Sequence, residues 1–249
     1  MINPYIIGRP VFDPENFYGR EEEIRTINSH IENLIPLSMI GERGIGRTSL
    51  LHYISHPKII EKHLETDRYM ILYFNLTGFS QFTKEQIWRE FLNKIRKFLN
   101  KSKRDSVVNI PKNMNFGIMD IYELIEDFSR NDIRLVFCFD GFDAVSRNPN
   151  FDRAFFDCLR HFITVYPNVT YVTASKKSLD KLELSRDILS SPFFTYFDKM
   201  RIGFLKREET ERLIFKPSER EGVKFNEEDL GFVFNVAYCH PLFVQSTCH

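Results

Sequence analysis

Four short and almost uninterrupted apolar segments constrain the fold of this chain more than any other feature of its sequence. They are PLSMI (36–40), YMILYFNL (69–76), IRLVFCFD (133–140) and VTYVTAS (169–175). A continuous apolar run of this length is typical of a β-strand buried on both faces, as in parallel sheets. Because amphipathic segments alternate with these runs, we predict an α/β fold with three layers, in which helices cover both faces of a mainly parallel sheet.

The predicted helices change in arrangement along the chain. Before residue 206 they alternate with the strands, at 18–35, 48–56, 83–105, 118–128 and 151–166. Pro57 and Pro167 are expected to end two of them, and residues 109–117 are predicted to form a flexible connection. After residue 206, helical segments at 207–219, 226–238 and 241–249 follow one another without a strand. We therefore predict an α/β core over 1–205 and a small helical lid over 206–249.

Composition and charge exclude several classes of protein. Lys and Arg total 34, as do Asp and Glu, so the net charge gives no argument for a nucleic-acid or membrane partner. The four cysteines are scattered without a C-x-x-C pair, which argues against a disulfide framework or a zinc site. The N-terminus lacks a signal-peptide pattern, and no apolar segment is long enough to span a bilayer. We expect a cytoplasmic protein with no membrane partner.

The segment GERGIGRTSLL (41–51) directly follows the first apolar run and begins the next helix. It fits the phosphate-binding frame G-x-x-x-x-G-K-[ST], except that an arginine replaces the lysine. Glycines in such a loop let the backbone N–H groups point at a phosphate, and the helix start adds its positive dipole end. The predicted nucleotide-binding residues are Gly41, Gly44, Ile45, Gly46, Arg47, Thr48 and Ser49.

A second element of a nucleotide site is a carboxylate at the end of another buried strand. Asp140 ends the apolar run 133–140, and Asp143 follows in the turn. We predict that Asp140 and the hydroxyl of Thr48 hold Mg²⁺, and that Asp143 orients or activates the attacking water.

Arg47 keeps the positive charge of the expected lysine but presents it as a planar fork rather than a compact point. A loop sized for an ammonium group would place the guanidinium differently against the terminal phosphate, and a misplacement of about 1 Å can cost on the order of a hundredfold in rate. We therefore expect nucleotide binding with slow hydrolysis, with Asp143 and Arg47 as the catalytic residues.

Five segments, in order, resemble the STAND class of P-loop ATPases, which is related to AAA+ and NACHT proteins. They are NPYIIGRPV with FYGREEEI (3–11 and 17–24), GERGIGRTSLL, FCFDGFDAV (137–145), VTASKKSL (172–179), and the run from SSPFF (190–194) to CHPLFVQ (239–245). The resemblance implies that segment 1–22 lies on the adenine side, with Gly19 and Arg20 beside the base. It also implies that Lys176 lies near the γ-phosphate and Pro241 near the adenine. Lys176 replaces a frequent arginine of the family, and Cys239 replaces a glycine.

The resemblance implies a regulatory switch that binds ATP or ADP with Mg²⁺, associates with itself depending on the nucleotide, and belongs to a longer chain with further domains. The absence of an N-K-x-D run argues against guanine. Two alternatives stay open. One is a DNA-associated AAA+ ATPase of the replication-initiator type. The basic residues between 94 and 104 are its candidate surface, although the neutral overall charge favours a solvated helix face for them. The other is a catalytically inactive nucleotide-binding scaffold.

Overall fold

The computed structural model describes residues 3–65, 67–102 and 118–249. Its centre is a five-stranded sheet in the order β2-β3-β4-β1-β5, and every neighbouring pair of strands is parallel. The strands are β1 (Leu37–Ile40), β2 (Tyr69–Asn75), β3 (Arg134–Asp140), β4 (Val169–Ser175) and β5 (Asp198–Arg201). The predicted α/β fold with a mainly parallel sheet is therefore confirmed.

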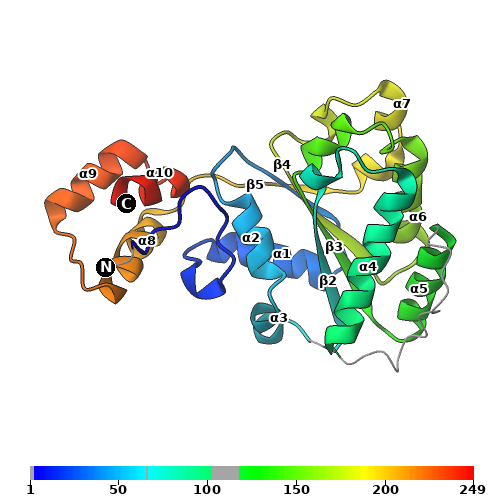
Figure 1. Ribbon diagram of the computed structural model, residues 1–249, viewed down its shortest axis with the longest axis horizontal. Coiled ribbons are helices and arrows are strands. Elements are labelled where there is room, and N and C mark those ends of the chain that lie inside the picture. The colour runs from blue at the N-terminus through cyan, green and yellow to red at the C-terminus, as the bar shows by residue number, and fades with distance from the viewer. Residues whose placement is uncertain (1–2, 66, 103–117) are drawn as a thin grey trace.

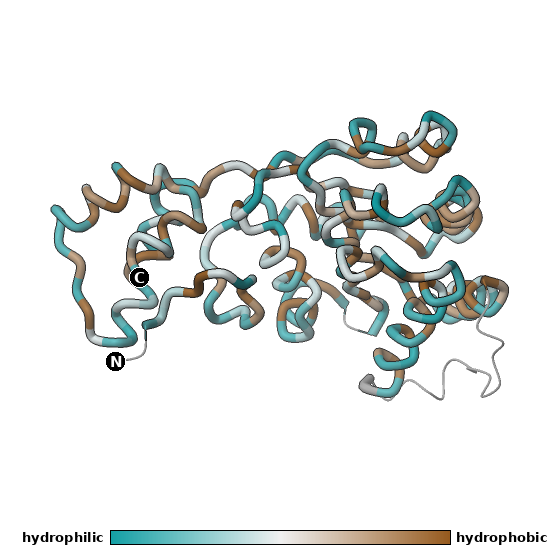
Figure 2. Tube along the Cα trace, turned by 45° about the horizontal axis from the view of Figure 1, so that its top comes forward, coloured by the Kyte–Doolittle hydropathy of each residue, from teal (hydrophilic) through white to brown (hydrophobic). Residues whose placement is uncertain are grey.

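Helices cover both faces of the sheet (Figure 1). One face carries α1 (Glu21–Glu32), α2 (Arg47–Ile54) and α3 (Pro57–His63), and the other carries α4 (Lys84–Ser102), α5 (Ile118–Arg130) and α6 (Arg153–Val165). These helices are amphipathic, as expected for helices that cover a sheet: in Figure 2 their tubes alternate between brown, hydrophobic and teal, hydrophilic stretches.

Successive residues of the inner strands point to opposite faces, so each strand contributes to two separate apolar cores. In β3, Phe137 packs with the cluster under α4, α5 and α6, whereas Val136 and Cys138 pack with the cluster under α1 and α2. All three side chains are fully buried. Burial on both faces explains why this strand reads as a continuous apolar run rather than an alternating one.

The described residues include elements that the sequence did not predict, among them a strand and a helix of the core. Strand β5 has the sequence DKMR, pairs with β1 at the edge of the sheet and is largely exposed, so no apolar run marks it. Helix α3 begins at Pro57, because proline is tolerated in a first helical turn, and the side chain of His56 accepts the N–H of Lys58. The proline that ends one predicted helix therefore also begins another. The predicted connection 109–117 lies outside the described residues.

The C-terminal helices α8 (Arg207–Arg220), α9 (Glu227–Ala237) and α10 (Pro241–Cys248) pack around their own apolar cluster. The short helix α7 (Arg186–Leu189) lies between β4 and β5 in the sequence. The N-terminal segment reaches the C-terminal helices rather than the sheet (Figure 1), and the hydroxyl of Tyr5 donates to the carbonyl of Ile214 at 2.7 Å. The two ends of the chain therefore lie side by side. Within the part that the structure describes, no helix is long and apolar enough to cross a membrane.

We predict that Phe137→Ala lowers the free energy of unfolding by about 3–5 kcal/mol, because it opens a cavity in the centre of the larger core. Phe232→Ala serves as the matched control, since this side chain is 61% exposed, and should change the same quantity by less than about 0.5 kcal/mol. Urea unfolding followed by circular dichroism measures both. Equal losses in the two variants would contradict this assignment of the core.

Candidate functional site

The glycine-rich loop connects the end of β1 to the start of α2, as predicted from the sequence. Gly44 and Gly46 have positive φ angles of 81° and 99°, which an L-residue with a side chain rarely adopts. Gly46 immediately precedes Arg47, the first residue of α2. This conformation leaves the N–H groups at the helix start available for an anion, where the helix dipole also favours negative charge.

The carboxylate of Asp140 lies next to the start of α2. Its Oδ2 accepts a hydrogen bond from the hydroxyl of Thr48 at 2.9 Å, and its Oδ1 accepts the N–H of Gly141 at 2.9 Å. Asp140 is only 7% exposed. The structure therefore brings together the two residues predicted to hold a cation.

A hydroxyl and a carboxylate are hard oxygen ligands of the kind that Mg²⁺ prefers. The described residues contain no group of three or more His, Cys, Asp and Glu side chains that could hold a metal on their own. Mg²⁺ is usually bound by one or two protein ligands together with phosphate oxygens and water. Thr48 and Asp140 are the residues that would hold it.

Asp143 links the end of β3 to the end of β4. Its two carboxylate oxygens accept the N–H of Lys176 at 2.9 and 3.0 Å, and Oδ1 also accepts the N–H of Lys177 at 3.3 Å. Lys176 is exposed, so the contact it makes with Asp143 comes from its backbone. The ammonium group of Lys177 pairs with Glu183 instead.

Arg47 is the first residue of α2, and its guanidinium lies within range of the charges of two aspartates. Burial lowers the pKa of this guanidinium, and the negative charges of Asp143 and Asp140 act in the opposite direction. An arginine remains charged under such conditions, since its ordinary pKa is above 12. Arg47 therefore supplies a fixed positive charge near Asp140 and Asp143.

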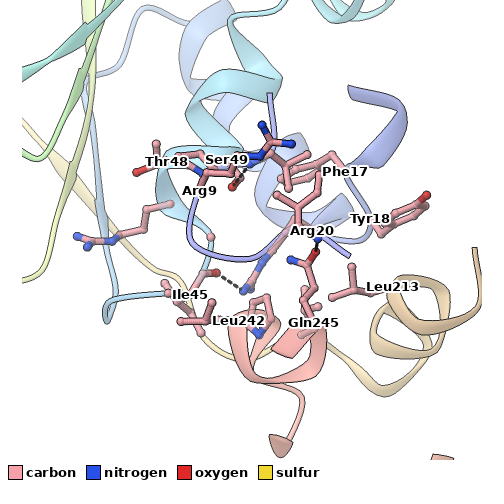
Figure 3. A pocket seen from close by; sticks show the side chains of 18 of the residues that line it. Arg9, Phe17, Tyr18, Arg20, Ile45, Thr48, Ser49, Leu213, Leu242 and Gln245 are labelled. Atoms are coloured by element: carbon pink, nitrogen blue, oxygen red, sulfur yellow. Dashed lines mark hydrogen bonds between the residues drawn. The ribbon is translucent and has the colours of Figure 1, made fainter. Parts of the chain in front are cut away.

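A cavity of about 350 Å³ opens above the loop (Figure 3). Its size suits a small organic ligand such as a nucleotide. Three parts of the chain enclose it: the N-terminal segment, the glycine-rich loop with the start of α2, and the C-terminal helices α8 and α10. The lining includes Ile6, Gly8, Arg9, Pro10, Val11, Tyr18, Arg20, Gly44, Ile45, Gly46, Arg47, Thr48, Ser49, Leu213, Pro241, Leu242 and Gln245.

Most of the predicted nucleotide-binding residues line this cavity, but three do not. Gly41 directly follows β1, and its N–H donates to the carbonyl of Ser175. Lys176 lies at the end of β4. Gly19 packs against α8, and a Cβ added to it would lie 2.8 Å from the Cβ of Glu209.

Arg20 lines the cavity, yet its guanidinium donates to the protein itself. Its Nη2 donates to the carbonyls of Ile45 at 3.0 Å and Gly203 at 2.6 Å, and its Nη1 pairs with Glu23 at 2.7 Å. The side chain is almost completely buried. Arg20 therefore fixes the glycine-rich loop to the segment that leads into α8.

The carboxylate of Glu209 joins the N-terminal segment to α8. Its Oε1 accepts the N–H of Arg20 at 2.7 Å, and its Oε2 accepts the N–H of Lys206 at 2.8 Å. Burial alone would raise the pKa of this carboxyl, but hydrogen bonds from Lys206, Glu21 and Arg20 outweigh that effect and hold the pKa below its ordinary value. Glu209 is therefore an ionised, buried clamp, which the sequence did not reveal.

Helix α10 packs directly on the glycine-rich loop. A Cβ added to Gly44 would lie 2.7 Å from the Cδ2 of Leu242 and 3.1 Å from the Cε1 of His240. The ring of His240 stacks on Phe243 at 4.4 Å, and burial lowers the pKa of this imidazole. The HP pair, suggested by resemblance alone, therefore lies against the phosphate-binding loop.

Sequence reasoning missed several side chains at the site. Gln245 lines the cavity, and its Oε1 accepts the N–H of Ile6 at 2.9 Å. The Oγ of Ser49 accepts the N–H of Val11 at 3.0 Å, which brings Arg9 to the rim. Gln245 belongs to the CHPLFVQ segment, which offered a signal for it, whereas nothing in the sequence singles out Arg9.

Comparison with known families agrees with this geometry. The family described as Novel STAND NTPase 2 matches residues 29–229. Since this match covers most of the chain, the protein belongs to the STAND class of P-loop NTPases, and specifically to that family. The opening segment and the HP pair lie outside the matched range. No curated protein matches the chain in sequence.

Solved structures with the same fold are AAA+-type ATPases. A Walker-type ATPase of Pyrococcus abyssi has a TM-score of 0.73 and 14% identity, over 96% of this chain and 68% of that one. The ORC2 protein of Aeropyrum pernix gives 0.66 and 13%, over 98% of this chain and 65% of that one. Domain III of the replication initiation protein DnaA of Thermotoga maritima gives 0.56 and 17%, over 96% and 86%. At such identities the likeness shows the fold alone.

We predict that Glu209→Gln lowers the free energy of unfolding by about 1–3 kcal/mol, because an amide nitrogen would face one of two backbone N–H donors. Glu208→Gln, one residue earlier on the exposed side of α8, is the matched control and should change it by less than about 0.5 kcal/mol. Urea unfolding at neutral pH compares the two. If Glu209→Gln lowered the free energy of unfolding no more than Glu208→Gln does, the carboxylate of Glu209 would not hold the N-terminal segment to α8.

Proposed function

We propose that this protein is a nucleotide-dependent switch that binds ATP or ADP with Mg²⁺ and hydrolyses ATP slowly. The supporting observation is the cavity that the glycine-rich loop, the N-terminal segment and the C-terminal helices enclose together. A nucleotide in it would touch all three parts. Occupancy, and the presence of a terminal phosphate, can therefore bias how the α/β core and the helices pack against each other.

The proposed roles follow from where the residues lie. Backbone N–H groups of Gly44, Ile45, Gly46, Arg47, Thr48 and Ser49 receive the phosphates. Mg²⁺, when bound, neutralises phosphate charge, and Thr48 and Asp140 hold it. Asp143, fixed by the backbone of Lys176 and Lys177, orients the attacking water.

The base is proposed to lie between the N-terminal segment and α10, near Pro241. Gly19 and Arg20 define that side of the cavity, because Gly19 packs against Glu209 and Arg20 is hydrogen-bonded to Glu209 and Ile45. Gly41 anchors the start of the loop to the end of β4, because its N–H donates to the carbonyl of Ser175. Lys176 acts through its backbone N–H, which donates to Asp143.

We propose the same division that the sequence indicated, with a core over 1–205 and a lid over 206–249. The three lid helices share one apolar cluster, so they can move as a unit. They contact the glycine-rich loop through Leu242 and His240, which gives the lid a direct contact with the phosphate site. A slow ATPase suits this use, because a switch needs long-lived states rather than fast turnover.

No observation favours the alternative of a DNA-associated ATPase. In the described part of segment 94–104, Lys94 pairs with Glu90 and lies over the ring of Phe74, as a helix-surface lysine would. Residues 103 and 104 lie outside the described part. The neighbours that act in replication share the fold, at identities too low to carry their partners to this chain.

Thermal unfolding with Mg²⁺ and ADP, ATP or GTP tests the proposal. A nucleotide at about 100 times its dissociation constant adds roughly 2.7 kcal/mol, which corresponds to an increase in Tm of about 5–10 °C for a chain of this size. We expect this increase with ADP and ATP and a smaller one with GTP. The protein should first be unfolded and refolded to remove any nucleotide carried from the cell. No increase with any nucleotide would exclude the proposed function.

We also predict that Arg47→Lys raises the rate of ATP hydrolysis by on the order of tenfold or more, because a compact ammonium restores the contact geometry for which the loop is built. Release of phosphate under saturating ATP and Mg²⁺ measures the effect. Asp143→Asn, combined with Arg47→Lys, should return the rate to background and so attribute the turnover to this site. An unchanged rate in Arg47→Lys would show that the arginine is not what limits hydrolysis.

A further inference from the structure

The cation-binding carboxylate has a third partner that no motif predicts. The hydroxyl of Tyr73 donates to Oδ2 of Asp140 at 2.9 Å, the same oxygen that accepts the hydroxyl of Thr48 at 2.9 Å. Tyr73 lies in β2, next to β3 in the sheet. With the N–H of Gly141 on Oδ1, three donors from three elements of the chain hold this carboxylate.

The ring of Tyr73 is itself fixed in place. It packs at a tilt against the imidazole of His52 in α2, with 4.2 Å between the ring centroids, and Phe12 lies edge-on to the same imidazole at 4.6 Å. A column of rings therefore runs from the N-terminal segment to the carboxylate. Such packing restricts the rotation of the phenol, so its hydroxyl keeps its aim at Asp140.

In this contact the phenol is the donor and the carboxylate the acceptor. The hydrogen bond to Asp140 therefore depends on the hydroxyl of Tyr73, whereas the contact with His52 depends on the ring alone.

We propose that Tyr73 is a positioning residue of the Mg²⁺ site, which holds Asp140 in the orientation needed to bind the cation. This inference rests on the proposed nucleotide-binding function. Hydrogen bonds to a ligating carboxylate set its direction, and their loss typically costs about 10–100-fold in metal affinity.

A purely structural role makes a different prediction. If Tyr73 served only to fill space in the core under α2, phenylalanine would replace it without loss, since the ring and its contacts with His52 are retained. If instead the hydroxyl positions Asp140, removing it weakens Mg²⁺ binding and leaves the binding of nucleotide without metal unchanged.

The experiment measures both quantities in wild type and Tyr73→Phe. Affinity for a fluorescent ADP analogue is determined in EDTA, and Mg²⁺ is then titrated into the nucleotide complex. We expect the Mg²⁺ concentration at half-saturation to rise by about tenfold in the variant, with the affinity in EDTA changed by less than about twofold. Tyr53→Phe is the matched control. Tyr53 is a partly buried tyrosine of α2 that stacks on Phe17 and does not line the cavity, and it should change neither value.

Three results would overturn the inference. Unchanged Mg²⁺ dependence in Tyr73→Phe would show that the hydroxyl is dispensable. An equal loss of affinity with and without metal would show that the hydroxyl supports the nucleotide site as a whole and does not act through the cation. Failure of the wild type to bind the analogue in either condition would instead exclude the nucleotide site itself, and the inference with it.

Discussion

Burial of both faces of the parallel sheet is the constraint on which the rest of the structure depends. It keeps β3 and β4 largely apolar, with Thr170 and Thr173 as buried hydroxyl residues within β4, and the carboxylate of Asp140 appears only where β3 ends. Asp140 and Ser175 are the last residues of β3 and β4, and the glycine-rich loop follows the last residue of β1. Since the strands are parallel, these three ends meet at one edge of the sheet. The site therefore lies where the sheet stops being apolar.

Features that burial or backbone geometry imposes on the sequence could be predicted from it. Four of the five strands, the loop with Gly44 and Gly46, and the pairing of Thr48 with Asp140 all follow from apolar runs and glycine spacing. Strand β5 could not be predicted, because an edge strand with exposed side chains has no apolar pattern. Glu209 and Tyr73 could not be predicted either. A glutamate in a first helical turn and a tyrosine in an apolar strand are both ordinary residues, and only their partners in space give them a role.

Polar contacts over long sequence separations add to apolar packing by Tyr5, Phe17 and Tyr18 in fixing the first part of the chain to the rest. Glu209 accepts the N–H of Arg20 across 189 positions of sequence, and Arg20 in turn donates to Ile45 across 25. Each of these bonds is short and buried, so each is costly to break without a replacement. Arg20, which belongs to the turn that resembles a base-binding turn, thus connects the glycine-rich loop to the C-terminal helices.

The opening residues of the chain have a mechanical consequence. Ile6 is attached to α10 through Gln245, and Val11 is attached to α2 through Ser49. Four residues lie between these anchors, and the five residue steps from one to the other reach at most about 18 Å in an extended chain. The segment is therefore a tether of fixed maximum length across the mouth of the cavity. Helix α10 can move away from the glycine-rich loop only until this tether is taut, and any wider separation must first release one of its two anchors.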